Sequence, residues 1–372
     1  MSARALALVL SLLAVSTPAR AAQRADTPYG IHSMVYVNAP VSFKEAMFRE
    51  AAATGAASIR VDVAMTAIVL GARGERDWAP LDEYLRLARR YRLQVVGVLL
   101  ATPWWLADCP QTTPDDESYK CAASRPEEWG GYAGQIAARA RGVIDDWEII
   151  NEPDGTWAYH GTPESYARTV AAAARHIHAA NSHARVLMGG AMSLASRDWL
   201  RRAFATPGAR LACSIDVANV HIRGRVRSLP QTVRSWRAFF ARQRVRAPLW
   251  VTEHGYPSDP RYQFDPAFRG GEQAQARYLA KSLPALLGAG AARVFVTERD
   301  NLAGTWASEG ILGGDVADPP LPNPAIRHKP AADAVRKLAR SLPANDADTP
   351  RVRHVKRRTN PRGAELRRRC KR

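Results

Sequence analysis

The sequence predicts an α/β fold in which eight parallel strands close into one (β/α)8 barrel. Strand-like and helix-like segments alternate eight times between residues 29 and 342, and no linker interrupts them. Such alternation is typical of a parallel sheet covered by helices. The length of 372 residues also suits one large barrel.

The composition is that of a globular protein. Hydrophobic residues make up 46% of the chain and charged residues 24%, which excludes a disordered chain. Glycine has no three-residue period and there are only four cysteines, which excludes a collagen-like or a disulfide-dense scaffold.

The expected strands are short apolar runs. Residues 93–101 (LQVVGVLLA) form a nearly continuous one, as expected of a parallel strand that is buried on both faces. The eight strand-like segments are 30–36, 57–64, 93–101, 143–150, 184–192, 215–222, 248–251 and 293–297.

A helix-like segment follows each of these strands. The second repeats Leu81, Tyr84, Leu85 and Ala88 at helical spacing. The eight segments are 42–54, 81–91, 129–141, 163–180, 198–204, 231–243, 271–287 and 328–342. Eight units favour a closed barrel, because closure removes exposed sheet edges. A doubly wound sheet would carry a glycine-rich turn after its first strand, where this chain reads VNAP at 37–40.

Residues 1–21 are typical of a signal peptide. An apolar run covers residues 5–15, and a small-residue cleavage site follows at 19–21. The run is shorter than the roughly 20 residues of a membrane span; a buried N-terminal helix is the alternative. We expect a mature chain that begins near Ala22, is secreted or periplasmic, and has no membrane span.

Export would permit disulfide bonds. Cys109 and Cys121 lie in one polar, proline-rich segment. A disulfide bond between them would lower the conformational entropy of the unfolded chain. Two free thiols are the alternative. Cys213 and Cys370 have no evident partner in the sequence.

The positive charge gathers at the C-terminus. The chain carries a net charge of +18, and residues 349–372 contribute +10 of it through eleven basic residues and one acid. We expect residues 343–372 to form a disordered basic tail beyond a catalytic domain at 22–342. Because an exported protein seldom meets nucleic acid, we expect no nucleic-acid partner. The composition favours a solvated tail without a specific partner, and the alternative is a tail that contacts an anionic polysaccharide or the cell surface.

Two expected strands end in a glutamate. Residues 147–153 read WEIINEP, so Glu152 stands where Pro153 stops further ladder bonding. Residues 249–256 read LWVTEHGY, with Glu253 in the corresponding place. In a barrel of this kind, active residues lie at the carboxyl ends of the strands. One such glutamate alone would be taken for a solvated loop residue, but the fourth and the seventh strand both have one.

These two motifs resemble the glycoside hydrolases of clan A, which have TIM-barrel folds. The context of Asn151-Glu152-Pro153 is most similar to family 39 and its endoglycosidase relatives, and less similar to family 5. The resemblance implies a retaining hydrolase with Glu152 as acid/base and Glu253 as nucleophile. It also implies that Asn151 contacts the sugar 2-hydroxyl and that Arg60 holds the nucleophile. The alternative for Arg60 is an arginine at the surface.

Further residues are expected to bind substrate. His221 matches a clan position that faces the pocket, whereas Arg223 stands where many members have an aromatic residue. His32, at the first strand, is expected in the pocket but could equally be structural. Tyr256, the last residue of the second motif, is also expected to bind substrate. The tryptophans in expected mouth loops are Trp104, Trp105, Trp157 and Trp306. We expect one or two of them, Trp104 and Trp306 first, to stack on sugars rather than fill the core.

The eighth strand departs from the clan, which often has a tryptophan at its end. This chain has Glu298 and Asp300 there. They could bind a substrate, or pair with Arg60, Arg223 or Arg299 as structural ions.

The expected function is hydrolysis of β-linked oligo- or polysaccharides, with no cofactor and no metal. His176 and His178 do not share a helix face, and no strand end offers two histidines and a carboxylate. The chain also lacks the Gly-x-Ser-x-Gly elbow of serine hydrolases. The alternative function is an inactive sugar-binding barrel that holds anionic polysaccharide through its tail.

Overall fold

The computed structural model describes residues 27–341, except 73, 110–116, 260–268, 302–305 and 318–319. Eight parallel strands form a central sheet: β1 (Tyr29–Tyr36), β2 (Ser58–Ala64), β3 (Gln94–Leu100), β4 (Asp146–Ile149), β5 (Arg185–Met188), β6 (Ala218–His221), β7 (Leu249–His254) and β8 (Arg293–Thr297). Their order is β5-β4-β3-β2-β1-β8-β7-β6. Parallel bridges from Leu187 to Val217 and from Ala191 to Val220 join β5 to β6. The predicted closure into a TIM barrel is therefore confirmed.

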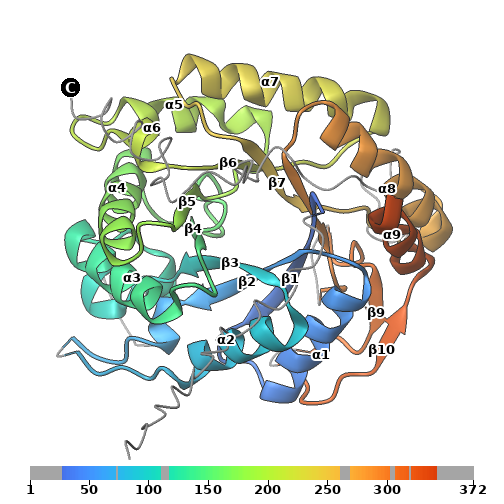
Figure 1. The fold of residues 1–372 in the computed structure, drawn as a ribbon. Coiled ribbons are helices and arrows are strands. Elements are labelled where there is room, and N and C mark those ends of the chain that lie inside the picture. The colour runs from blue at the N-terminus through green and yellow to red at the C-terminus, as the bar shows by residue number, and fades with distance from the viewer. Residues whose placement is uncertain are drawn as a thin grey trace, which may run out of the picture.

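The helices form a ring around the strands (Figure 1). They are α1 (Val41–Ala53), α2 (Ala79–Tyr91), α3 (Pro126–Ala140), α4 (Pro163–Ala180), α5 (Arg197–Ala205), α6 (Leu211–Ser214), α7 (Leu229–Arg242), α8 (Gly271–Gly288) and α9 (Pro330–Ser341). The predicted helical segments agree with these elements to within a few residues, except that the short α6 was not expected.

Two apolar clusters hold the barrel together. The larger one includes outward-facing strand residues such as Ile59 and Val61 together with helix residues such as Leu85. The smaller one fills the barrel interior with Val96, Leu187, Val217, Trp250 and Phe295. Side chains along a strand point alternately to the two faces, so β3, β5, β7 and β8 each contribute to both clusters. The inner cluster forms the floor beneath the polar mouth of the barrel.

A two-stranded hairpin follows β8 and was not predicted. It consists of β9 (Leu312–Gly314) and β10 (Ile326–His328), paired antiparallel. Strands of three residues carry too short a pattern to be recognised in a sequence.

The predicted disulfide bond between Cys109 and Cys121 is present, with the two Cα atoms 6.0 Å apart. The segment that it closes lies between β3 and α3. Cys213 is not a free thiol, and Cys370 lies outside the described residues. The expected signal peptide (1–21) and basic tail (343–372) lie outside them as well. Among the described helices, none is long and apolar enough to cross a membrane.

Candidate active site

The two predicted glutamates meet at the carboxyl-terminal mouth of the barrel. Glu152 follows β4 and Glu253 lies near the end of β7, and both are buried. One oxygen of each carboxyl and a ring nitrogen of His221, from β6, all lie within 4.8 Å of one another. A cavity of about 930 Å³ opens over them. Residues about 100 positions apart in the chain therefore face one space.

The end of β4 has an unusual backbone that directs Glu152. Ile150 and Glu152 both have positive φ, at 65° and 42°, a conformation that costs non-glycine residues energy and is concentrated at functional sites. Gly190, after β5, leaves room for the ring of His221 beside Glu152, because a Cβ at position 190 would lie 2.1 Å from Nε2 of His221. The sequence motif indicates the glutamate but not this geometry.

A register irregularity directs Glu253 into the cavity. The pairing of β7 with β8 shifts between Val251 and His254, and that of β6 with β7 shifts between Val220 and His221. A bulge of this kind re-aims a side chain. Glu253 consequently faces the cavity, whereas His254 turns to Ser282 of α8, with 2.7 Å between Nε2 and Oγ. The expected strand, 248–251, ended before this irregularity.

Arg60 of β2 is the centre of the charge network. It is 1% exposed, so the alternative of a surface arginine is wrong. Its Nη1 donates to Glu253 Oε1 at 3.1 Å, and its Nη2 donates to Asn151 Oδ1 at 2.7 Å. Glu148, which the sequence analysis did not single out, accepts two further bonds from Arg60, at 2.8 and 2.9 Å. The sequence does contain one sign of this role: Trp147 and Glu148 are consecutive in β4, so their side chains point to opposite faces of the sheet.

His32 is a neutral neighbour of the nucleophile candidate. Arg60 Nη1 donates to its Nδ1 at 2.9 Å, which places the imidazole proton on Nε2, 3.5 Å from Glu253 Oε1. Burial lowers the pKa of His32 to about 3, against a raising effect of Glu253. His32 therefore orients Glu253 through a dipole rather than a charge.

Arg223 is a second cation on Glu253. Its Nη2 lies 3.1 Å from Glu253 Oε2, and its guanidinium also donates two bonds to Glu309, at 2.8 and 2.6 Å. The guanidinium carbon lies 4.7 Å from the ring centre of Trp306, which lines the cavity as expected. The residue that departs from the clan pattern thus joins the nucleophile candidate to the loop after β8.

The two glutamates differ in charge state. Burial raises the pKa of Glu253, but the charges around it, that of His221 foremost and those of Arg60 and Arg223 after it, outweigh burial and hold the pKa well below its usual range. Burial also raises the pKa of Glu152, and the nearby Glu253 raises it further, against an opposing effect of His221. Nδ1 of His221 lies 2.5 Å from Glu152 Oε1 and 3.4 Å from Glu253 Oε2. The site can thus hold one carboxylic acid beside one carboxylate.

The same three side chains could in principle ligate a cation. Glu152, His221 and Glu253 are the group of potential ligands found among the described residues. However, Arg60 and Arg223 each donate to one of the two oxygens of Glu253. Their positive charges oppose a metal ion. The donor set therefore fits acid–base chemistry better than metal binding.

Two expected substrate-binding residues lie away from this cavity. Trp104 is 58% exposed and does not line this cavity. Tyr256 is buried, and its hydroxyl donates to the backbone oxygen of Arg269 at 2.7 Å. That they bind substrate stays a prediction, because sequence position indicates a loop but not the direction of a side chain.

Glu298 and Asp300 have structural partners. Ser33 donates a hydrogen bond to Glu298, which is fully buried. Asp300 pairs with Lys329 at 2.6 Å, and Lys329 also reaches Ser258 at 3.0 Å. Lys329 thereby ties together the loops after β7 and β8. Neither acid forms an ion pair with the expected Arg60 or Arg223.

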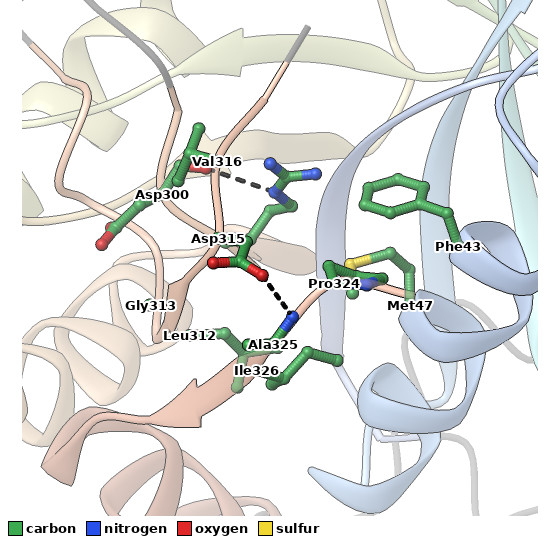
Figure 2. Close-up of a pocket in the computed structure, with 11 residues that line it drawn as sticks. Phe43, Met47, Asp300, Leu312, Gly313, Asp315, Val316, Pro324, Ala325 and Ile326 are labelled. Atoms are coloured by element: carbon green, nitrogen blue, oxygen red, sulfur yellow. Dashed lines mark hydrogen bonds between the residues drawn. The ribbon is translucent and has the colours of Figure 1, made fainter. Parts of the chain in front are cut away.

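A small cavity lies beneath the β9–β10 hairpin, away from the glutamates. Figure 2 shows Phe43 and Met47 of α1 pointing toward Asp315 and Ala325 of the hairpin region. Its volume of about 10 Å³ holds no more than a water molecule. This cavity reflects the packing of the hairpin against α1 rather than a binding site.

Comparison with known proteins agrees with this geometry. Residues 149–289 match the family described as "Glycosyl hydrolase catalytic core", a segment that contains both Glu152 and Glu253. No curated protein sequence matches the chain.

Solved glycosidase structures share the fold. One is a family 39 glycoside hydrolase from the gut symbiont Bacteroides cellulosilyticus WH2 (TM-score 0.59, 15% identity, 82% of this chain and 63% of that chain). A GH39 β-xylosidase from Caulobacter crescentus has a TM-score of 0.61 at 17% identity, with 86% of this chain and 73% of that chain covered. An exo-β-1,4-mannosidase from Opitutaceae bacterium strain TAV5 has a TM-score of 0.58 at 18% identity (85% and 59%). This chain thus spans about three fifths of the first and third of these structures.

At such identities the likeness concerns the fold. Together with the matched catalytic core, it confirms the resemblance to family 39 and other clan A glycosidases that the two glutamate motifs predicted.

Proposed function

We propose that this protein is a retaining glycoside hydrolase that cleaves β-linked glycans by double displacement. The observation that carries the proposal is the pair of buried carboxyls, whose oxygens approach within 4.8 Å and whose pKa values shift in opposite directions. Retaining glycosidases hold their carboxyl groups about 5–5.5 Å apart, whereas inverting enzymes separate them by about 6.5–9.5 Å. The spacing therefore supports retention.

In the first step, the carboxylate of Glu253 attacks the anomeric carbon. The bond from that carbon to the glycosidic oxygen breaks, and the oxygen takes the proton of Glu152. Arg60 and Arg223 keep Glu253 ionised for this attack. The raised pKa of Glu152 favours the protonated form that the first step needs.

In the second step, water attacks the anomeric carbon and the ester bond to Glu253 breaks. Glu152 takes the proton of the water. Because the charge on Glu253 is one cause of the raised pKa of Glu152, ester formation removes that contribution. The pKa of Glu152 then falls, which suits a general base.

The remaining contacts position the sugar. Asn151, held by Arg60 through its Oδ1, can present its amide N–H groups to the 2-hydroxyl. Trp306 offers an aromatic face that Arg223 steadies.

The test is hydrolysis of 4-nitrophenyl β-glycosides of xylose, glucose, galactose and mannose, followed by NMR of the product. The wild-type enzyme should release a β-anomer first. Glu152→Gln should still form the glycosyl-enzyme from these activated substrates, and azide should restore turnover as a β-glycosyl azide. An α-anomer as first product would overturn the assignment of Glu253 as nucleophile. No turnover on any β-glycoside, with sugar binding retained, would favour the inactive sugar-binding barrel.

We also propose that the protein is secreted or periplasmic. The disulfide bond between Cys109 and Cys121 supports this location, because such bonds persist in oxidising compartments. The mass of the native protein should show cleavage before Ala22, and an intact N-terminus would contradict the proposal.

The charge of residues 343–372 supports contact with an anionic polysaccharide. Truncation after Leu342 should weaken binding to such a polymer at low salt and leave activity on neutral aryl glycosides unchanged. Equal binding by both forms would contradict it.

A further inference from the structure

A second cavity adjoins the one that contains the two glutamates. It has a volume of about 370 Å³, which is within the usual range for ligand sites. Four residues line both cavities: Tyr36, Asp62, Asn151 and Trp157. We call this second cavity the side compartment. It extends from the catalytic cavity between the segments that follow β3 and β4.

Half-exposed aromatic side chains surround the side compartment. Tyr36 is 46% exposed, Tyr119 is 47% exposed and Trp157 is 58% exposed. Soluble proteins rarely display several large apolar side chains around one hollow unless something binds there. Tyr and Trp combine an apolar face with a polar tip, which suits the apolar faces and hydroxyl groups of sugars.

A carboxyl group stands at the junction of the two cavities. Asp62 follows Arg60 by two positions in β2, so both side chains point into the barrel mouth. Arg60 binds Glu148 and Glu253, whereas no described side chain hydrogen-bonds the carboxyl of Asp62. Burial raises the pKa of Asp62 to about 7, against the lowering effect of Arg60. The Asp62 carboxyl is therefore available to a sugar hydroxyl, as acceptor or as donor.

The backbone of the side compartment is held in place. The backbone N–H of Thr102 donates to Tyr119 O at 2.8 Å, and that of His160 donates to Lys120 O at 2.9 Å. The disulfide bond of Cys121 fixes the same segment to Cys109. Ala101, on the wall, has a φ of 68°, and strained residues of this kind are concentrated at ligand sites. The compartment is thus formed before any ligand arrives.

The position of Asn151 indicates which part of a substrate would enter. On the proposed function, Asn151 contacts the sugar that becomes bonded to Glu253, and Asn151 lines both cavities. The side compartment therefore adjoins that sugar rather than the leaving group. The opposite part of the catalytic cavity, lined by Met192, Ser193 and Gly224, remains for the leaving group.

We infer that the side compartment binds a second saccharide unit, attached to the sugar whose glycosidic bond is cleaved. This inference rests on the proposed function and narrows its substrate class to glycans with at least two units on that side of the bond. Tyr119 and Trp157 would contact the faces of the second unit, and Asp62 would bind its hydroxyls or those near the linkage.

The experiment compares substrates that differ only in the second unit. The pairs are 4-nitrophenyl β-xyloside with 4-nitrophenyl β-1,4-xylobioside, and the corresponding glucose and mannose pairs. The leaving group and the catalytic residues are common to both members. We expect kcat/KM of the preferred disaccharide to exceed that of its monosaccharide at least tenfold, which corresponds to about 1.4 kcal/mol.

Two variants test whether the side compartment causes this preference. Tyr119→Ala, which changes a residue of the side compartment alone, should lower the disaccharide-to-monosaccharide ratio to within about threefold of one, mainly through KM. Asp62→Asn should lower the ratio as well. Leu70→Ala is the control, because Leu70 is 57% exposed, as Trp157 is 58% exposed, but lines neither cavity. The ratio of this control should match that of wild type.

The outcomes separate the two proposals. If no β-glycoside is cleaved, the proposed function is overturned and the inference with it. If monosaccharides and disaccharides are cleaved with equal kcat/KM, or if the ratio survives in Tyr119→Ala, the inference alone is overturned.

Discussion

The ends of β7 and β8 present the same residue in opposite states. Glu253 at the end of β7 and Glu298 just after β8 are both buried glutamates on adjacent strands. The pKa of Glu253 lies well below its usual range, whereas burial raises the pKa of Glu298 to about 8. Arg60 and Arg223 contact Glu253, while no described cation forms an ion pair with Glu298.

The difference shows that burial does not by itself make a glutamate functional. Burial favours the neutral acid at both positions. Only around Glu253 do positive charges, from His221, Arg60 and Arg223, also converge and favour the carboxylate form. Of the two glutamates, only Glu253 lines the catalytic cavity. The four predictions below test this contrast, from the largest expected effect to the smallest.

The largest effect should separate the two glutamates by activity. Glu253→Gln should lower kcat by at least about 10⁴-fold, since it removes the nucleophile. Glu298→Gln should stay within about threefold of wild type. Steady-state kinetics on the preferred aryl glycoside would measure both. If Glu298→Gln lowered kcat as much as Glu253→Gln, the two glutamates would not differ in function.

Removal of Arg60 should destabilise the barrel. Arg60→Met leaves Glu148 buried without its partner, a change that typically costs about 3–5 kcal/mol. Urea denaturation would measure it. The double variant Arg60→Met/Glu148→Gln is the control and should recover part of the loss, because it removes the unpaired charge. No recovery would mean that Arg60 stabilises through packing alone.

Removal of Arg223 should alter the pH profile of kcat/KM. Arg223→Gln takes one cation from Glu253, so the pKa of Glu253 rises and the acid limb of kcat/KM moves to higher pH. The exposed Arg225 provides the control variant, Arg225→Gln, whose acid limb should match that of wild type. An unmoved limb in Arg223→Gln would show that Arg60 alone sets the charge of Glu253.

The smallest effect should be a pH-dependent stability difference at Glu298. The folded pKa of about 8 lies above the ordinary value of 4.5. The neutral acid therefore stabilises the fold fully below pH 4.5, and this stability is lost as the pH rises through 8. Glu298→Gln lacks this loss, so its Tm should exceed that of wild type by a few degrees at pH 8 and match it near pH 4. Parallel Tm curves for the two proteins would contradict the raised pKa.

Much of the architecture could be predicted because it depends on local pattern. Apolar runs and helical spacing indicated the eight strand–helix units, and the two motifs indicated Glu152 and Glu253, which the structure brings together. Arg60 was expected to hold a carboxylate, because a charged residue in an apolar strand needs a partner. Trp104 was expected at the site from its loop position and Tyr256 from the strand-seven motif, but neither lines the cavity over the glutamates.

The sequence by itself thus determined the barrel, the disulfide bond and the two glutamates, since each follows from residue types at short spacing. Only the tertiary structure decided which charges surround them. Glu148, Arg223 and Asp62 become partners or neighbours of the site through the register of separate strands, and a bulge in β7 turns Glu253 inward. Barrel closure brings together residues up to about 200 positions apart. Local sequence patterns do not predict which of these distant residues will be in contact.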